Sequence, residues 1–370
     1  MASQFELPRI ERLDFEDEIL CEIATADGAL ALLRGLGSGL TRRRGDAPGT
    51  VWALGDRGPN LATAKRRVKI MPTPRFGPAI SELSIDGHGV RLVRSLPLRG
   101  RSGRAISGLP LPGEEGEVAV DLQGVPHAGD PSGADTEGIA ASREGCFWIA
   151  DEYGPSLLRV GADGTIEFRW IPEGTAQRFV GADYPVIEAL PPIAATRRLN
   201  RGFEGIALAP DERSLYAAFQ SPLDGEAAMH GVRLWQLDVR DGRLLGEWRY
   251  PFDEPATFLR DCALGPFDWP DLKVCELVCV NEARLLVLER GSATTRLYSV
   301  TLDAKQTSSA APPLLVKSLL LNSDEHPEIG VDIEGVALLS PRTLLLVNDN
   351  DFGVEGVTTK FWRVELPADV

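Results

Sequence analysis

The sequence is poor in the residues that support several common kinds of site. Histidine occurs only four times in 370 residues, and no two histidines have the spacing of zinc ligands, so a histidine-based zinc site is not expected. The chain has five cysteines, an odd number that does not provide a simple disulfide framework. No run of 18 apolar residues occurs, and no membrane insertion is therefore expected.

Positive charge is also scarce, because 39 Lys and Arg face 54 Asp and Glu and the formal net charge is −15. This balance argues against nucleic-acid binding, which requires a basic surface, and against docking on an anionic membrane. An excess of carboxylates is compatible with cation binding, and equally with solubility alone. Residues 1–4 lack the basic-then-apolar pattern of a signal peptide. We expect a cytoplasmic protein, or a periplasmic or secreted one if the sequence begins after a removed signal.

Glycine and proline are abundant, with 38 and 27 copies spread along the chain, which predicts many short elements joined by turns. A short motif recurs in which a glutamate precedes a glycine and an apolar run. Its clear copies have Glu137, Glu204 and Glu334, separated by 67 and 130 residues, or about one and two repeat lengths. Weaker copies are Ser38-Gly39-Leu40 and Cys275-Glu276-Leu277.

The residues after each motif predict three further strands. A strand with large apolar residues ends in a polar cluster, and most copies continue with a hairpin. The hairpin turns are Asp86-Gly87, Asp163-Gly164 and Asp241-Gly242; Asp-Gly between alternating strands is a strong signal of a tight turn. Four strands in roughly 50 to 70 residues are typical of a propeller blade.

The sequence therefore predicts an all-β fold, a β-propeller of four-stranded antiparallel blades, five or six in number, forming one domain over residues 1–370. The last unit ends after its third strand near 360–366, and residues 9–15 are expected to supply the missing strand and close the ring. Residues 99–134 and 173–200 interrupt the repeat and are expected to be loop insertions. The first insertion contains a strand-like segment at 117–122 that could belong to a degenerate sixth blade.

The acidic residues of the repeat are expected to meet at one end of the central channel. Residues two apart on a strand share a face, and the first strand of a blade begins where the antiparallel second strand ends. The acids expected at the starts of first strands are Asp135, Glu137, Glu204, Asp332 and Glu334. The polar residues expected at the ends of second strands are Asp56, Asp151, Glu152, Glu289, Asn348 and Asp349.

Carboxylates packed in this way repel one another, and a divalent cation would relieve the repulsion. Ligands that are all oxygen favour Ca²⁺ or Mg²⁺ over zinc. Arg57 and Arg290 each follow an acid and precede a glycine, and could clamp a phosphate or carboxylate. The structural alternative is that each acid before a glycine only caps a turn, and that the acid–arginine pairs are surface ion pairs.

Several segments resemble the phytase-like family, described as esterase-like activity of phytase. The resemblance runs from about residue 35 to 365 and rests on the glutamate–glycine motifs together with four polar segments: 55–59, 150–155, 288–291 and 348–353. It implies a β-propeller whose repeated acids carry phosphoester or ester hydrolysis, in a family with many exported bacterial members. The segment Gln220-Ser221-Pro222 departs from the pattern and removes one acid. At the level of fold the sequence is also similar to the gluconolactonase and paraoxonase propellers, which hold Ca²⁺ in the channel.

The leading hypothesis is a metal-dependent hydrolase, leaning towards a phosphoester as the small-molecule substrate of a monomeric protein. The ion, calcium rather than magnesium, would be held by Glu137, Glu204 and Glu334 with help from Asp151 or Asp349. The catalytic candidates are Glu152 as general base and Arg57 and Arg290 as anion clamps. Two alternatives are a calcium-dependent lactonase or carboxylic esterase, and a non-catalytic propeller that calcium holds together.

Overall fold

The structure is a computed structural model and describes residues 7–25, 28–65, 67–113, 117–303 and 312–370. The described chain is almost entirely β-structure, with one short α-helix, α1 (Leu259–Leu264), and several 3₁₀ turns. Five sheets have four or five strands each, and we number them 1 to 5 in chain order. The abundance of glycine and proline is therefore realised as many short strands, as predicted.

Sheets 1 to 3 account for the first part of the chain. Sheet 1 consists of β4 (Gly39–Thr41), β5 (Thr50–Leu54), β8 (Ala79–Asp86) and β9 (Gly89–Pro97). Sheet 2 consists of β11 (Thr136–Ala141), β12 (Phe147–Asp151), β13 (Ser156–Val160), β14 (Ile166–Pro172) and β15 (Val186–Leu190). Sheet 3 consists of β16 (Phe203–Leu208), β17 (Ser214–Phe219), β18 (Gly231–Asp238) and β19 (Leu244–Pro251).

Sheets 4 and 5 complete the set. Sheet 4 consists of β20 (Lys273–Asn281), β21 (Arg284–Arg290), β22 (Thr295–Thr301) and β23 (Lys317–Asn322). Sheet 5 consists of β24 (Ile333–Ser340), β25 (Thr343–Asn348), β26 (Phe361–Glu365) and, from the N-terminal region, β1 (Arg9–Leu13). Strand β1 pairs antiparallel with β26, so that Leu13 lies opposite Phe361. The prediction that residues 9–15 supply the last strand of this unit is confirmed.

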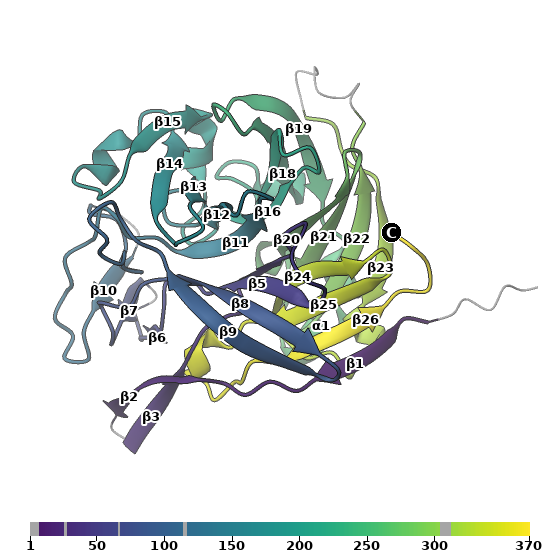
Figure 1. The fold of residues 1–370 in the computed structure, drawn as a ribbon, viewed down its shortest axis with the longest axis horizontal. Coiled ribbons are helices and arrows are strands. Elements are labelled where there is room, and N and C mark those ends of the chain that lie inside the picture. Colours follow the sequence, from purple (N-terminus) through teal and green to yellow (C-terminus); the bar gives the residue numbers. More distant parts are fainter. Residues whose placement is uncertain (1–6, 26–27, 66, 114–116, 304–311) are drawn as a thin grey trace, which may run out of the picture.

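The five sheets follow one another around a common centre (Figure 1). The first strand of each sheet contacts the first strand of the next in the order β4, β11, β16, β20 and β24, and β24 contacts β4 again. A separate buried hydrophobic cluster fills the space between each pair of neighbouring sheets. Between sheets 5 and 1, for example, Val347 and Phe361 pack with Leu40 and Val51. Apolar burial thus holds each sheet against its two neighbours.

The glycines of the repeated motif allow the first strands to approach each other closely. The pairing register shifts at the motif in β11, β16, β20 and β24, as in a β-bulge. A Cβ atom on Gly205 would lie 2.8 Å from the backbone carbon of Glu276, and one on Gly335 would lie 2.9 Å from Leu40 Cγ. At Gly138 a Cβ atom would overlap the carbonyl oxygen of Glu204. The motif therefore combines an acid with a glycine because the strands leave no room there for a side chain.

The two interruptions of the repeat are not purely loops. Residues 117–122 do contain a strand, β10 (Val118–Val120), but it pairs parallel with β7 (Val68–Ile70). The resulting small sheet, completed by β6 (Leu61–Ala62), is not a sixth four-stranded unit. Residues 173–200 contain β15, which adds a fifth, parallel strand to sheet 2, between two 3₁₀ turns. A further hairpin, β2 (Ile19–Thr25) with β3 (Gly28–Leu33), stands apart from the five sheets.

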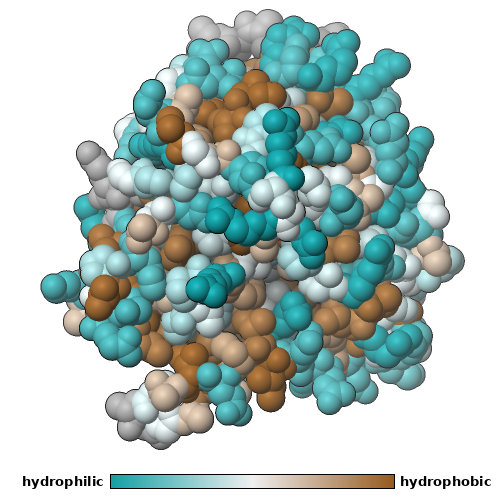
Figure 2. Space-filling view, turned by 60° about the vertical axis from the view of Figure 1, so that its left-hand side comes forward, coloured by the Kyte–Doolittle hydropathy of each residue, from teal (hydrophilic) through white to brown (hydrophobic). Residues whose placement is uncertain are grey.

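The predicted hairpins are present, because Asp86-Gly87, Asp163-Gly164 and Asp241-Gly242 connect β8 to β9, β13 to β14 and β18 to β19. The longer connection predicted between β22 and β23 includes residues 304–311, which lie outside the described part of the chain. Hydrophilic side chains predominate on the surface shown in Figure 2, and apolar groups appear there in separate patches.

Candidate functional site

The glutamates of the three clear motifs lie side by side around the channel. Glu137, Glu204 and Glu334 come from β11, β16 and β24 and expose only 9%, 1% and 8% of their surface. In β20 the corresponding position is Cys275, which lies within the register shift as Glu334 does in β24, and in sheet 1 it is Ser38, directly before β4. The weak copies of the motif thus contribute a thiol and a hydroxyl at the level where the clear copies contribute carboxylates.

A second layer of polar residues follows the second strands of the sheets. The members of this layer are Asp56, Glu152, Gln220, Arg290 and Asp349. The two layers contact each other directly: the Gln220 side chain donates a 2.6 Å hydrogen bond to Glu204, and the Arg290 guanidinium pairs with Glu334. The predicted convergence of acids from several sheets on one end of the channel therefore exists in the structure.

Three overlapping groups of potential ligands result from this convergence. In each group the ligand atoms lie within 4.8 Å of one another: Asp56, Asp135 and Glu137; Glu137, Glu152 and Glu204; and Glu204, Cys275 and Glu334. Glu137 and Glu204 each belong to two groups, so the carboxylates form one continuous strip. We refer to the second of these groups as the middle group.

An arginine pairs with one carboxylate of each outer group. The Arg57 guanidinium lies 3.3 Å from Asp135 of the first group and 3.1 Å from the neighbouring Glu117. Arg290 pairs with Glu334 of the third group and with Asp332, and donates a 3.2 Å hydrogen bond from Nε to the Cys275 sulfur. Both predicted anion clamps therefore already hold carboxylates of the protein.

The middle group has no such partner. Glu152 is fully buried and neither of its carboxylate oxygens has a hydrogen-bond partner among the described residues; Glu204 Oε2 is also unpaired. Burial, together with the charges of Glu204 and Asp135, raises the pKa of Glu152 well above its ordinary value. Burial and the neighbouring Glu334 raise the pKa of Glu204 to about 7. Buried polar atoms are normally paired, and these three carboxylates fit a divalent cation, which would satisfy them together.

Asp349 lies beside this strip rather than within one of the three groups. It is half-buried, and its Oδ1 accepts a 3.0 Å hydrogen bond from the backbone N–H of Asp351. Burial and the charges of Glu334 and Asp351 raise its pKa to about 8. Asp56 is similar, because burial and the charge of Asp349 raise its pKa well above the ordinary value.

Three residues that were expected at this end of the channel point elsewhere. Asp151 is completely buried, pairs with Arg169 and accepts hydrogen bonds from Ser156 and two backbone N–H groups. Glu289 accepts hydrogen bonds from Tyr250 and Lys317 in a separate buried network. The amide of Asn348 bonds only to backbone atoms.

The reason for this error is the alternation of side chains along a strand. Strand β12 ends at Asp151 and strand β25 at Asn348, whereas Glu289 is the last residue but one of β21. Each of these three residues directly precedes a residue that does face the channel. Of two adjacent acids, only one can point to the axis. The expectation that Asp151 and Glu152 lie there together was therefore wrong, because Asp151 is engaged by Arg169, Ser156 and backbone N–H groups instead.

Two cations that sequence reasoning missed lie next to the strip. Arg201 precedes β16 and donates a weak 3.5 Å hydrogen bond to Ser221, and Lys273 begins β20 opposite Arg290. Neither forms an ion pair within the described residues. Repulsion from Arg290, burial and repulsion from Arg201 lower the pKa of Lys273, and burial lowers that of Arg201. The charges of Glu152 and Glu204 act on Arg201, and that of Glu334 acts on Lys273, without a direct ion pair among the described residues.

The sequence carried a signal for Lys273. The clear motifs of sheets 2 and 5 have an aspartate two residues before the glutamate, Asp135 and Asp332, whereas the weak motif of sheet 4 has Lys273 two residues before Cys275. In sheet 4, lysine thus replaces the aspartate of the motif and cysteine replaces its glutamate, and the lysine reverses the charge at its position. This reversal places one positive charge within an otherwise acidic repeat.

Antiparallel sheets arranged in succession around one axis, with buried acids at one end of it, define a propeller-type β protein. The chain matches the model of the Phytase-like family, described as esterase-like activity of phytase, over residues 32–352, and it belongs to this family. An uncharacterized secreted protein of Arthroderma benhamiae is 27% identical over 213 residues. This match covers 49% of the chain and 42% of the relative, so it spans less than half of either protein.

The chain also matches solved structures at low sequence identity and low TM-score. The PQQ-bound aldose sugar dehydrogenase of Streptomyces coelicolor is 13% identical with a TM-score of 0.36, over 97% of this chain and 98% of the other. The calcium-binding protein regucalcin of Agrobacterium tumefaciens is 15% identical with a TM-score of 0.38, over 90% of this chain and 91% of the other. Within the described residues, no helix has the length and apolar character needed to span a bilayer.

Proposed function

We propose that this protein is a calcium-dependent hydrolase that cleaves a small phosphoester at the acidic end of its channel. In this proposal sheets 1 to 5 are the five blades of one propeller domain, and β1 completes the last blade. Membership in the Phytase-like family supports hydrolysis of an ester bond. The name of the Arthroderma relative supports secretion, which we propose for this protein as well.

The observation that carries the metal proposal is that Glu152 is buried without a hydrogen-bond partner for its carboxylate. A fully buried carboxylate with two unpaired oxygens is costly unless a cation is bound beside it. Since Arg57 and Arg290 already pair with carboxylates of the outer groups, the ion belongs in the middle group. The proposed ligands are therefore Glu137, Glu152 and Glu204, while Glu334 is held by Arg290 and Asp151 is excluded. Oxygen ligands from side chains alone favour calcium, with magnesium as the alternative.

The remaining residues would handle the substrate. A bound divalent cation would supply Lewis acidity for the ester and a more acidic water molecule. Arg201 and Lys273 would bind the phosphate oxygens, because they are the unpaired cations beside the middle group. Arg57 and Arg290 would act as positioning residues that hold Asp135 and Glu334 in place.

Asp349 replaces Glu152 as the proposed general base. Glu152 is fully enclosed and belongs with the metal ligands, whereas Asp349 is half-buried and one of its oxygens accepts a hydrogen bond from the backbone. Its pKa of about 8 lies near neutrality, where a group can both accept and release a proton.

The test is hydrolysis of three chromogenic or titratable substrates by the full chain: p-nitrophenyl phosphate, p-nitrophenyl butyrate and δ-valerolactone, each with calcium and with chelator. We expect calcium-dependent turnover of the phosphate ester. In Lys273→Met the KM for this substrate should rise about tenfold or more, while the exposed control Glu173→Gln should behave as wild type. Turnover of only the butyrate or the lactone would replace the phosphoester with those substrates. No turnover of any of them, with calcium still bound, would leave calcium as a structural tie between sheets 2 and 3.

A further inference from the structure

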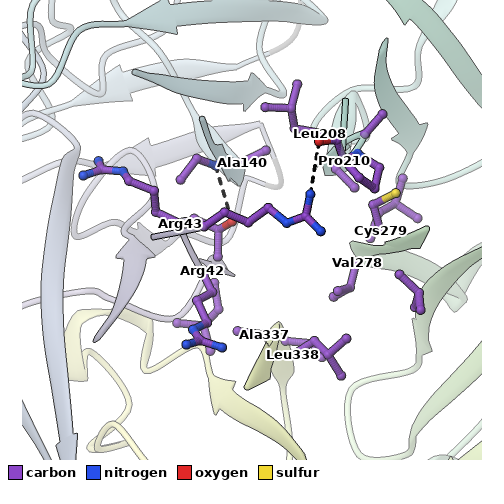
Figure 3. A pocket seen from close by; sticks show the side chains of 18 of the residues that line it. Arg42, Arg43, Ala140, Leu208, Pro210, Val278, Cys279, Ala337 and Leu338 are labelled. Atoms are coloured by element: carbon purple, nitrogen blue, oxygen red, sulfur yellow. Dashed lines mark hydrogen bonds between the residues drawn. The ribbon is translucent and has the colours of Figure 1, made fainter. Parts of the chain in front are cut away.

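The opposite end of the channel contains a second, chemically different cavity. Its volume is about 630 Å³, and the far ends of all five first strands, β4, β11, β16, β20 and β24, line it. The apolar side chains of Leu208, Val278 and Leu338 surround its open space (Figure 3). Arg42, Arg43 and Arg44 lie in its wall, in the loop that follows β4, and Arg43 points away from the open space. This volume lies within the range of pockets for small organic ligands, about 300–1,000 Å³.

A buried glutamate separates this cavity from the acidic end of the channel. Glu276 is 1% exposed, and its two oxygens accept hydrogen bonds from the backbone N–H groups of Leu40, at 2.9 Å, and Leu277, at 3.2 Å. The N–H of Val336 also bonds to it. These three residues belong to β4, β20 and β24 and also line the cavity. Glu276 thus links three strands between the cavity and the acidic end, and none of the acidic groups described above lines the cavity.

The charged groups of the cavity are mainly arginines. Arg42 donates a 2.6 Å hydrogen bond to the carbonyl oxygen of Leu339, and Arg44 donates a 3.1 Å hydrogen bond to that of Pro210. Both acceptors are neutral, and neither guanidinium has an ion pair among the described residues. Arg43 is different, because it packs over Trp52 and Phe147.

The acids around the cavity do not cancel these two charges. Among the described residues of the wall, Glu212 is the one acidic side chain; it accepts a hydrogen bond from the backbone N–H of Arg143 and lies 3.8 Å from its guanidinium. Val370 also lines the cavity, and within the described residues its terminal carboxylate forms no ion pair with Arg42 or Arg44. Asp211 and Glu282 lie near Cys279 at the rim; burial, rather than these charges, chiefly raises the pKa of that thiol to about 12. The thiol is therefore neutral at ordinary pH and adds to the apolar wall.

We propose that this cavity binds a small amphiphilic anion, an aliphatic or aromatic carboxylate. Its charged group would meet Arg42 and Arg44, whose planar guanidinium groups suit a carboxylate. Its apolar body would lie against the ends of the first strands, which removes apolar surface from water on both sides. This site is independent of the acidic site at the other end of the channel, because Glu276 lies between the two.

The test uses calorimetric titration of the full chain with three eight-carbon probes that differ in charge: octanoate, octanol and octyltrimethylammonium. We expect saturable binding of octanoate, at least tenfold weaker binding of octanol, and no binding of the cation. Arg44→Met, an exposed position, and the double variant with Arg42→Met should each weaken octanoate binding, the double variant at least tenfold. The control Arg240→Met changes an arginine that pairs with Asp238 in sheet 3, away from the cavity, and should bind as wild type.

Two further results decide the proposal. Glu152→Gln should bind octanoate as wild type does, whatever its effect at the acidic end. Binding of the three probes with equal affinity, or undiminished octanoate binding by a folded Arg44→Met variant and by the double variant, would overturn the proposal. Absence of saturable octanoate binding by the wild-type protein would overturn it as well.

Discussion

Replacement of Glu152 by glutamine should have opposite effects on stability with and without calcium. Glutamine keeps the size of the side chain and removes its charge. In the metal-free protein at pH 8 the change relieves repulsion among three buried carboxylates, and the free energy of unfolding should rise by about 1–2 kcal/mol. In the calcium-loaded protein the same change removes one of three proposed ligands.

The size of the calcium effect follows from binding linkage. A ligand at 100 times its Kd stabilises the folded state by about 2.7 kcal/mol. If the loss of one carboxylate weakens binding about 100-fold, the same calcium concentration contributes only about 0.4 kcal/mol. For a chain of this size about 1 kcal/mol corresponds to roughly 1.3 °C in Tm. We therefore expect calcium to raise the Tm of the wild type by about 3.5 °C and that of the variant by about 0.5 °C.

Scanning calorimetry with chelator and with calcium measures both effects. Glu289→Gln is the matched control, because Glu289 is equally buried but bonds to Tyr250 and Lys317. This control should be destabilised under both conditions, by about 3 kcal/mol, since it removes one member of a buried ion pair. The reasoning is refuted if Glu152→Gln is less stable than the wild type without metal, or if calcium stabilises both proteins equally.

Three further predictions concern stability measured by chemical denaturation. Folding raises the pKa of Glu204 from 4.5 to about 7, so between these pH values Glu204 is protonated in the folded chain and ionised in the unfolded chain. The free energy of unfolding of the metal-free protein should therefore fall by about 3 kcal/mol between pH 4.5 and 7. A free energy of unfolding that rises over this range would contradict the assignment. Gly138→Ala should cost at least about 2 kcal/mol, because its Cβ would overlap the backbone of Glu204, whereas Gly89→Ala, whose Cβ would make only ordinary contacts at 3.8 Å, should be nearly neutral. Asp151→Asn should cost about 3–5 kcal/mol with or without calcium, because it leaves the buried Arg169 without a charged partner; a loss seen only with calcium would return Asp151 to the ligand set.

Much of the architecture could be predicted from the sequence because it depends on local patterns. Asp-Gly turns fix the hairpins, and the incomplete last unit indicates that the N-terminal segment supplies β1. The convergence of Glu137, Glu204 and Glu334 follows from their equivalent positions in antiparallel units. The fifth strand of sheet 2 and the small sheet with β10 could not be predicted, because both depend on parallel pairing between distant segments.

The sequence could not predict which charged residues face the channel and which pair with one another, for a different reason. Which of two adjacent acids faces the axis depends on where a strand ends, so Asp151 and Glu152 could not be separated. Arg57 and Arg290 were expected to bind substrate, yet their partners come from other sheets and are visible only in the folded chain. The middle group stands out as a metal site because it is the group that these arginines leave without a cation.

The most direct test of the account is the position of a bound ion. Crystals of the full chain grown with calcium and then exchanged into Mn²⁺ would place the ion through its anomalous scattering. The account predicts one strong peak among the carboxylates of Glu137, Glu152 and Glu204, at coordination distance from all three, and its loss in Glu152→Gln. A peak at Glu334 and Asp349 instead, or no peak at a Mn²⁺ concentration that stabilises the protein, would contradict it.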